Sequence, residues 1–84
     1  MLVTKGRQFM KYIIFEDFAG EATPVIFPRR IDFEEMREQV PYTKVLSAGM
    51  VSLEQGMIKC HGRSVELGLG SLGGDSRIIT NHLA

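Results

Sequence analysis

The sequence predicts a small α+β domain in which a mainly antiparallel sheet carries two short helices. The stretch Lys44–Leu69 contains three short runs rich in apolar residues, separated by turns at Gly56 and Gly62. Runs with period-two alternation and glycine turns at their ends are typical of an antiparallel meander. Two further apolar runs come earlier, and one helical pattern lies on each side of the meander. The resulting order, ββ-α-βββ-α, predicts a small mixed sheet with both helices packed on it.

Length and charge limit the possible functions. The chain has 84 residues, with ten Lys and Arg against ten Asp and Glu. A domain of this size buries only about 60–65% of its unfolded surface, so little stability is left for a strained active site. This favours a homo-oligomer over a monomeric enzyme. Zero net charge also favours self-association, and it argues against a protein that holds nucleic acid mainly through phosphates.

The expected compartment is the cytoplasm. Cys60 is the single cysteine, so no intramolecular disulfide can form. No apolar run approaches the roughly 20 residues that span a bilayer, and the first residues lack the pattern of a signal peptide. We therefore expect no membrane partner.

The first half of the chain should supply two strands. Residues 1–9 show no period and are interpreted as a flexible extension, so the domain is expected to cover residues 10–84. Lys11–Phe15 is apolar on both faces and predicts a buried strand. Pro24–Phe27 follows a polar loop, and its prolines favour an edge position.

The first helix should begin at Asp32. Asp32 and Glu35 have the spacing of a capping box, and Pro41 should end the helix. A helix of this length is not stable alone. It should therefore pack on the sheet through the apolar residues around its first turn and along one face, namely Ile31, Phe33, Met36 and Val40.

The meander should follow this helix. Lys44–Leu53 is apolar on both faces, as expected for a central strand, and Ala48-Gly49 within it indicates the close approach of a helix or a bulge. Met57–His61 is the next strand. Ser64–Leu69 is the third, with Val65, Leu67 and Leu69 expected on one face.

A glycine-rich turn leads into the last helix, Ser76–Leu83, with Asp75 as the expected N-cap. Ile78, Ile79, His82 and Leu83 should share one face of this helix. The turn could hold an anion on its backbone N–H groups; the candidate residues are Gly70, Ser71, Gly73, Gly74 and Ser76. However, the motif lacks the βαβ context of a nucleotide site, and Asp75 would repel an anion. The turn is therefore interpreted as a flexible connector, and the anion site is the alternative.

Other reactive residues give weak signals. Cys60 could be a nucleophile or a metal ligand with His61 or His82. Cys60 and His61 are adjacent on a strand and point to opposite faces, so Cys60 is interpreted as a small core residue. The carboxylates Glu16, Asp17 and Glu21 lie in a polar loop with no predicted pocket to raise a pKa. The sequence therefore predicts no catalytic residue, no metal site and no cofactor.

Three arginines are candidate partner contacts. Arg29 and Arg30 precede the first helix, and Arg63 lies at a turn of the meander. Each could bind a phosphate or an acidic partner. Equally, Arg29 and Arg30 could pair with Glu34 and Glu35 as ordinary surface charge.

Several segments together resemble a known group of proteins. They are Pro24–Pro28, Leu46–Val51, Cys60–Leu69 and Asp75-Ser76. The chain from residue 10 onward resembles small uncharacterised proteins encoded by bacteriophages and prophages. The resemblance implies a phage or prophage gene expressed in the cytoplasm of a bacterial host. It implies no catalytic residue.

These observations favour a phage-type binding module that acts as a homo-oligomer, or that binds a host or phage protein. Pairing of an exposed strand, Pro24–Phe27 or Ser64–Leu69, across a two-fold axis would form the oligomer. The alternative is nucleic-acid association in phage gene regulation, through the arginines and an exposed Tyr12 or Phe15 for stacking. An enzyme is not expected.

Overall fold

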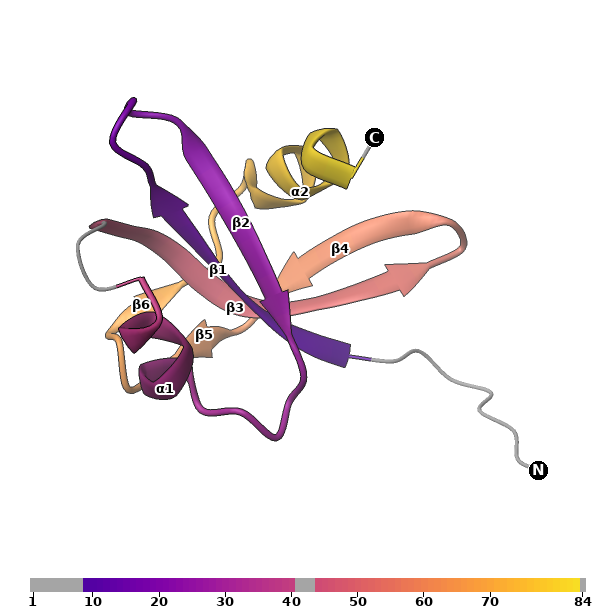
Figure 1. Ribbon diagram of the computed structural model, residues 1–84. Helices are drawn as coiled ribbons and strands as arrows, with labels where there is room; N and C mark the ends of the chain where they lie inside the picture. The colour runs from indigo at the N-terminus through magenta and orange to yellow at the C-terminus, as the bar shows by residue number, and fades with distance from the viewer. Residues whose placement is uncertain (1–8, 41–43, 84) are drawn as a thin grey trace.

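The computed structural model describes residues 9–40 and 44–83 and contains a four-stranded sheet with a short helix on each face (Figure 1). The strand order is β2-β1-β3-β4, and neighbouring strands are antiparallel. The bounds are Phe9–Glu16 for β1, Ala22–Phe27 for β2, Lys44–Glu54 for β3 and Met57–His61 for β4. β1 and β3 thus form the centre of the sheet, and β2 and β4 are its edges.

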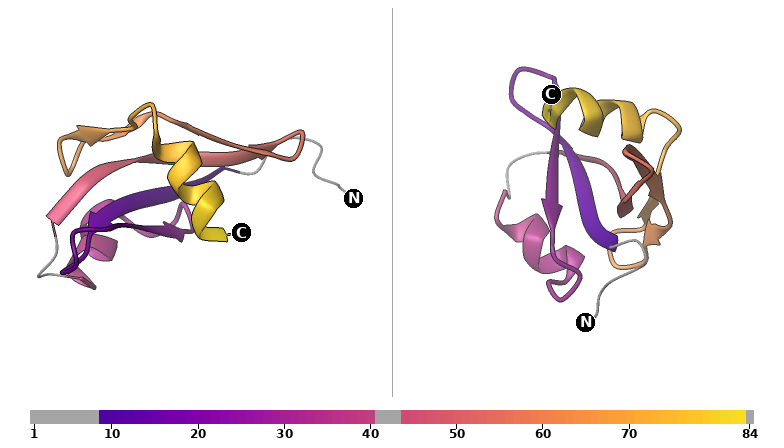
Figure 2. Two further views of the ribbon diagram at one scale, coloured as in Figure 1. Left: turned by 90° about the horizontal axis from the view of Figure 1, so that it is seen from above. Right: turned by 90° about the vertical axis from the view of Figure 1, so that its right-hand side faces the viewer.

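The remaining elements divide between the two faces. Helix α1 (Phe33–Glu38) and a two-stranded sheet of β5 (Arg63–Ser64) and β6 (Leu69–Gly70) lie on one face. Helix α2 (Asp75–Leu83) lies on the other face, where it contacts both edge strands, β4 and β2. Figure 2 shows α2 crossing the sheet on the side away from α1.

Alternation along β1 sends side chains into two separate cores. Ile13 and Phe15 pack with Phe27, Phe33 and Ala48 under α1. Tyr12 and Ile14 point to the opposite face, where they pack with Val51 and Ile79 under α2. A strand buried on both faces explains why Lys11–Phe15 is apolar without a period.

The predicted fold class, a small α+β domain with a mainly antiparallel sheet, is confirmed. Asp32 is the N-cap of α1, and its backbone N–H donates to Glu35 Oε1 at 3.3 Å, as the capping box requires. Phe33 is buried, with Ile31, Met36 and Val40 packed around the same core. The β3 strand is paired on both sides, as expected of a central strand.

The third strand of the meander differs from the prediction. Arg63–Ser64 and Leu69–Gly70 pair with each other, and the residues between them form a turn. Val65 is 81% exposed and Leu67 packs on the α1 core, so the expected shared face does not form. Alternation over Ser64–Leu69 was misleading because Gly68, at φ +69°, turns the chain back on itself.

The first strand begins two residues earlier than predicted. Phe9 was expected in the N-terminal extension, but it pairs with Ser52 of β3. The rest of that prediction, for residues 1–8, lies outside the described residues.

The backbone at Gly49 is closely approached, but not by the helix that the sequence predicts at Ala48-Gly49. A Cβ atom on Gly49 would lie 2.6 Å from the carbonyl oxygen of His61 and 3.3 Å from the ring of Tyr12. The neighbours are the end of β4 and an aromatic ring of β1, not a helix. A bulge also exists, at Leu46, where the β1–β3 register shifts.

Candidate functional site

A buried polar pair joins the last helix to the centre of the sheet. Tyr12 on β1 and Asp75 at the start of α2 are both almost fully buried, and the Tyr12 hydroxyl donates a hydrogen bond to Asp75 Oδ2. The same carboxylate oxygen accepts the backbone N–H of Leu72 at 2.9 Å. Two donors therefore satisfy this buried oxygen of Asp75.

Burial changes the ionisation of the groups around this pair. Desolvation, reinforced by the hydrogen bond to Asp75 and its negative charge, raises the pKa of Tyr12 far above its usual value. Desolvation and the nearby Asp75 charge also raise the pKa of the half-buried Cys60 thiol to about 11. Both groups are held in their neutral forms at neutral pH. This is the opposite of the lowered pKa that an activated nucleophile needs.

The interpretation of Cys60 as a core residue is confirmed. Cys60 packs on the α2 side of the sheet with Ile58. His61 is exposed on the other face and lies edge-on against Phe9, with ring centroids 5.3 Å apart. Cys60 and His61 therefore do not line one site. The described residues 9–40 and 44–83 contain no group of three His, Cys, Asp or Glu side chains able to hold a metal.

The predicted role of Asp75 as N-cap is wrong. Asp75 is the first residue of α2, and the backbone N–H of Ile78 donates to the carbonyl of Gly74. The Asp75 side chain turns inward to Tyr12 instead of capping its own helix. The apolar face is also shorter than predicted, because Ile79 is buried and Ile78 half-buried, whereas His82 and Leu83 are exposed.

The candidate anion site lies around this carboxylate. Gly73 and Gly74 form the turn before α2, Ser76 lies in its first turn, and Gly70 belongs to β6. The N–H of Ser71 already donates to the Gly62 carbonyl at 3.0 Å. The backbone N–H of Leu72 already donates to Asp75. This carboxylate would also repel an added anion.

The arginine candidates are exposed, whereas the two residues proposed for stacking are buried. Arg29 and Arg30 are exposed in the turn after β2, and Arg63 is exposed on β5. Tyr12 and Phe15 are buried in the two cores, so the prediction that either could stack on a base is wrong. The buried strand that the sequence predicts at Lys11–Phe15 already argues against an exposed ring there.

The loop carboxylate Asp17 organises the β1–β2 connection. Its Oδ1 accepts the backbone N–H groups of Ala19 and Glu21, each at 2.9 Å, and its Oδ2 accepts the Thr23 hydroxyl at 3.3 Å. These hydrogen bonds, led by that from Glu21, lower the pKa of Asp17. Asp17 therefore has a structural role in the turn.

An apolar groove lies on the sheet beside α2, and we call it the sheet groove. It has a volume of about 210 Å³ and is lined by Met10, Ile26, Val51, Ser52, Leu53 and Ile58. None of these six residues is charged, and Leu53 is 61% exposed. Helix α2 crosses the strands from β4 to β2 and is about 10–12 Å wide with its side chains, whereas the eleven residues of β3 span about 36 Å. The helix therefore covers only part of the length of this face.

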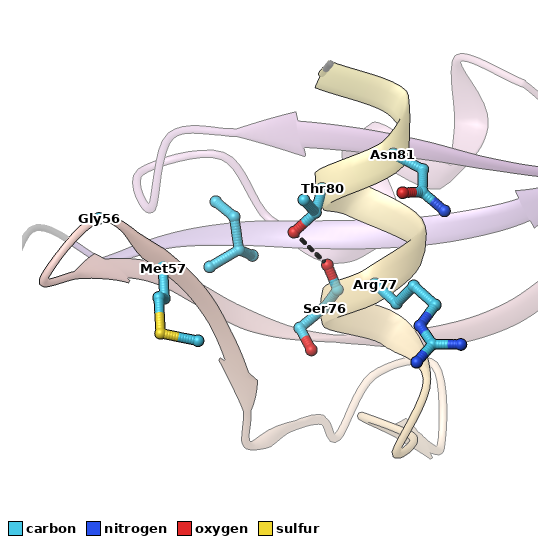
Figure 3. Close-up of a pocket in the computed structure, with 7 residues that line it drawn as sticks. Gly56, Met57, Ser76, Arg77, Thr80 and Asn81 are labelled. Atoms are coloured by element: carbon cyan, nitrogen blue, oxygen red, sulfur yellow. Dashed lines mark hydrogen bonds between the residues drawn. The ribbon is translucent and has the colours of Figure 1, made fainter.

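A second groove, the helix groove, lies between the β3–β4 hairpin and α2 (Figure 3). It has a volume of about 290 Å³ and is lined by Gly56, Met57, Ile58, Ser76, Arg77, Thr80 and Asn81. The hairpin side is apolar and the helix side is polar. The Thr80 hydroxyl donates to the Ser76 carbonyl at 2.7 Å, which holds its side chain along the helix. Ile58 lines both grooves.

Sequence reasoning did not identify either groove. The alternation of β3 and β4 places Val51, Leu53, Ile58 and Cys60 on one face, but it does not show where α2 ends. Only the width of a helix compared with the length of β3 could have indicated an uncovered surface. Among the described residues, no helix is long and apolar enough to cross a membrane.

Comparisons of the chain with protein-family models, with curated proteins and with solved structures gave no match. The resemblance to phage and prophage proteins therefore stays a prediction, and the proposals below depend on the geometry of the chain.

Proposed function

We propose that this protein is a small binding module that acts as a homo-oligomer, and that two copies associate through the sheet groove. The observation that carries the proposal is an uncharged apolar surface at the end of the sheet that α2 leaves uncovered. Exposed apolar surface of this kind marks interaction sites. A second copy offers the same uncharged surface, so a two-fold contact would bury no unpaired charge.

The strand edges offer less support for self-association. Pro24 lies within the β2 edge and has no N–H to donate. Lys59 lies at the centre of the β4 edge, where a two-fold pairing centred on it would bring two positive charges together. Proline and lysine are common means of preventing edge-to-edge pairing. The Ser64–Leu69 edge expected from the sequence does not exist. A face contact is therefore preferred here over an edge contact.

Light scattering over a dilution series at two salt concentrations tests the proposal. The wild type should be a dimer that salt does not weaken, because the contact is apolar. Leu53→Lys should give a monomer at concentrations where the wild type is dimeric. Val65→Lys is the matched control, since Val65 is also exposed but lies in the β5–β6 turn outside the groove. A wild type that is monomeric at high micromolar concentration would contradict the proposal.

As part of the same proposal, the protein works in the cytoplasm of a bacterial host, as the phage resemblance implies. Nucleic-acid association through Arg29, Arg30 and Arg63 is the competing function. It requires a salt-sensitive mobility shift with DNA or RNA that is lost when Arg29→Glu and Arg30→Glu are combined.

A further inference from the structure

The backbone of β4 has hydrogen-bonding groups directed away from the sheet. Gln55 and Gly56 close the β3–β4 hairpin with φ values of +53° and +79°, as in a two-residue type I′ turn. In such a hairpin the flanking pair, Glu54 and Met57, is hydrogen-bonded, and hydrogen-bonded pairs then alternate along the ladder. Of the paired residues of β4, Met57, Lys59 and His61 therefore exchange backbone hydrogen bonds with β3. The N–H and C=O groups of Ile58 and Cys60 face the open edge.

Strand β4 presents apolar side chains on the α2 side of the sheet and Lys59 on the opposite face. Ile58 and Cys60 lie on the α2 side, where Ile58 lines the helix groove. Lys59 lies on the opposite face and is exposed. Arg77 of α2 is exposed at the helix groove and is the only charged residue among those that line it. A strand added here would meet apolar side chains at alternate positions and positive charge at the others.

The exposed charged side chains of the segment around this edge, residues 57–83, are mostly basic, as Lys59 and Arg77 are. Among residues 57–83, three basic side chains, Lys59, Arg63 and Arg77, are exposed. Of the two carboxylates in this segment, Asp75 is buried against Tyr12 and only Glu66 is exposed. An acidic partner would therefore be attracted to this side of the molecule, and a second copy presenting its own Lys59 would be repelled.

We propose that the β4 edge binds an extended segment of another protein in which apolar and acidic residues alternate. The segment pairs as an added strand with Ile58 and Cys60, its apolar side chains lie on the α2 side, and its carboxylates lie on the opposite face beside Lys59, while Arg77 adds positive charge from α2. Backbone pairing supplies affinity and the alternate side chains supply specificity in this mode of recognition. The inference rests on the proposed role as a binding module, but it uses a different surface from the self-association contact.

Fluorescence anisotropy with short labelled peptides tests the charge preference. A peptide that alternates valine with glutamate should bind, and a peptide that alternates valine with lysine should bind at least about tenfold more weakly. Lys59→Glu combined with Arg77→Glu should reverse this preference. Arg30→Glu, a charge reversal in the turn after β2, is the matched control and should leave it unchanged. Equal binding of the two peptides, or equal effects of the variants, would overturn the proposal.

Amide hydrogen exchange tests the strand pairing. In the free protein the amides of Ile58 and Cys60 should exchange faster than the amide of Lys59. The acidic peptide should slow the exchange of the Ile58 and Cys60 amides. An acidic peptide N-methylated on its backbone should lose this protection and bind more weakly. Protection of Ile58 and Cys60 that grows with protein concentration without peptide would mean that a second copy occupies the edge, and it would overturn the proposal.

The two surfaces can fail separately. Leu53→Lys should abolish the dimer and leave acidic-peptide binding in place. The combination of Lys59→Glu and Arg77→Glu should leave the dimer in place and abolish acidic-peptide binding. A monomeric wild type that binds the acidic peptide would contradict only the self-association contact. A dimer that does not discriminate between the peptides would contradict only the edge contact.

Discussion

The Tyr12 hydroxyl donates a hydrogen bond to the buried carboxylate of Asp75, which lies 63 residues further along the chain. This bond fixes the start of α2 against the central strand of the sheet. Because α2 is only nine residues long, it has little stability of its own. Its position beside the two grooves therefore depends on this polar contact and on the burial of Ile79.

Tyr12→Phe should destabilise the protein by about 1–3 kcal/mol, because the buried carboxylate loses one of its donors. Urea denaturation monitored by circular dichroism measures the change. Thr80→Val is the control, since it removes an exposed side-chain hydrogen bond and should cost less than about 0.5 kcal/mol. Equal losses of unfolding free energy in the two variants would show that the buried hydrogen bond contributes no more stability than an exposed one.

Stability should fall at alkaline pH. Cys60 has a pKa of about 11 in the folded chain, against about 8.5 in an unfolded chain. A raised pKa means that the folded state favours the neutral thiol, so its contribution is complete below about pH 8.5 and is lost as the pH rises towards 11. Tyr12 has a raised pKa too, so its contribution is complete below about pH 10, the pKa of an unfolded tyrosine, and is lost as the pH rises above that value. The urea midpoint measured across this range should fall less steeply in Cys60→Ala. If the urea midpoint of Cys60→Ala fell as steeply with pH as that of the wild type, the assignment of this loss to Cys60 would be wrong.

Gly49→Ala should destabilise the protein by about 1–3 kcal/mol, because overpacking forces the backbone to shift. The new Cβ atom would meet the carbonyl oxygen of His61, which belongs to the β4 backbone and cannot rotate away. Gly73→Ala is the matched control, since a Cβ atom there meets nothing within 4 Å. Thermal unfolding of the two variants distinguishes close packing from a general effect of glycine replacement.

Asp17 should contribute stability that is lost in acid. Its pKa is lowered in the folded chain by the hydrogen bonds that its carboxylate accepts. This contribution is present above about pH 4, the pKa of an unfolded aspartate, and is lost as the pH falls through the lower folded value. Asp17→Ala should therefore reduce the acid dependence of the urea midpoint. Glu21→Ala, which removes an exposed carboxylate from the same loop, should leave it unchanged; a similar effect of both would argue against a specific role for Asp17.

Local patterns in the sequence predicted most of the secondary structure. The capping box of Asp32 and Glu35 and the turn at Gly56 were recognisable because each depends on residues within a few positions. The same holds for the two-sided burial of Lys11–Phe15. Local alternation failed at Ser64–Leu69, because pairing partners, and not the period alone, decide whether a run becomes a strand.

The sequence by itself determined the fold class, the two-sided central strands and the packing face of α1, since these follow from periodicity and capping. Only the tertiary structure decided that Asp75 turns inward to Tyr12 and that α2 leaves Leu53 uncovered. It also decided which strand edge is open. These features depend on contacts between residues far apart in the chain and on the length of one element relative to another, and neither is written in a local pattern.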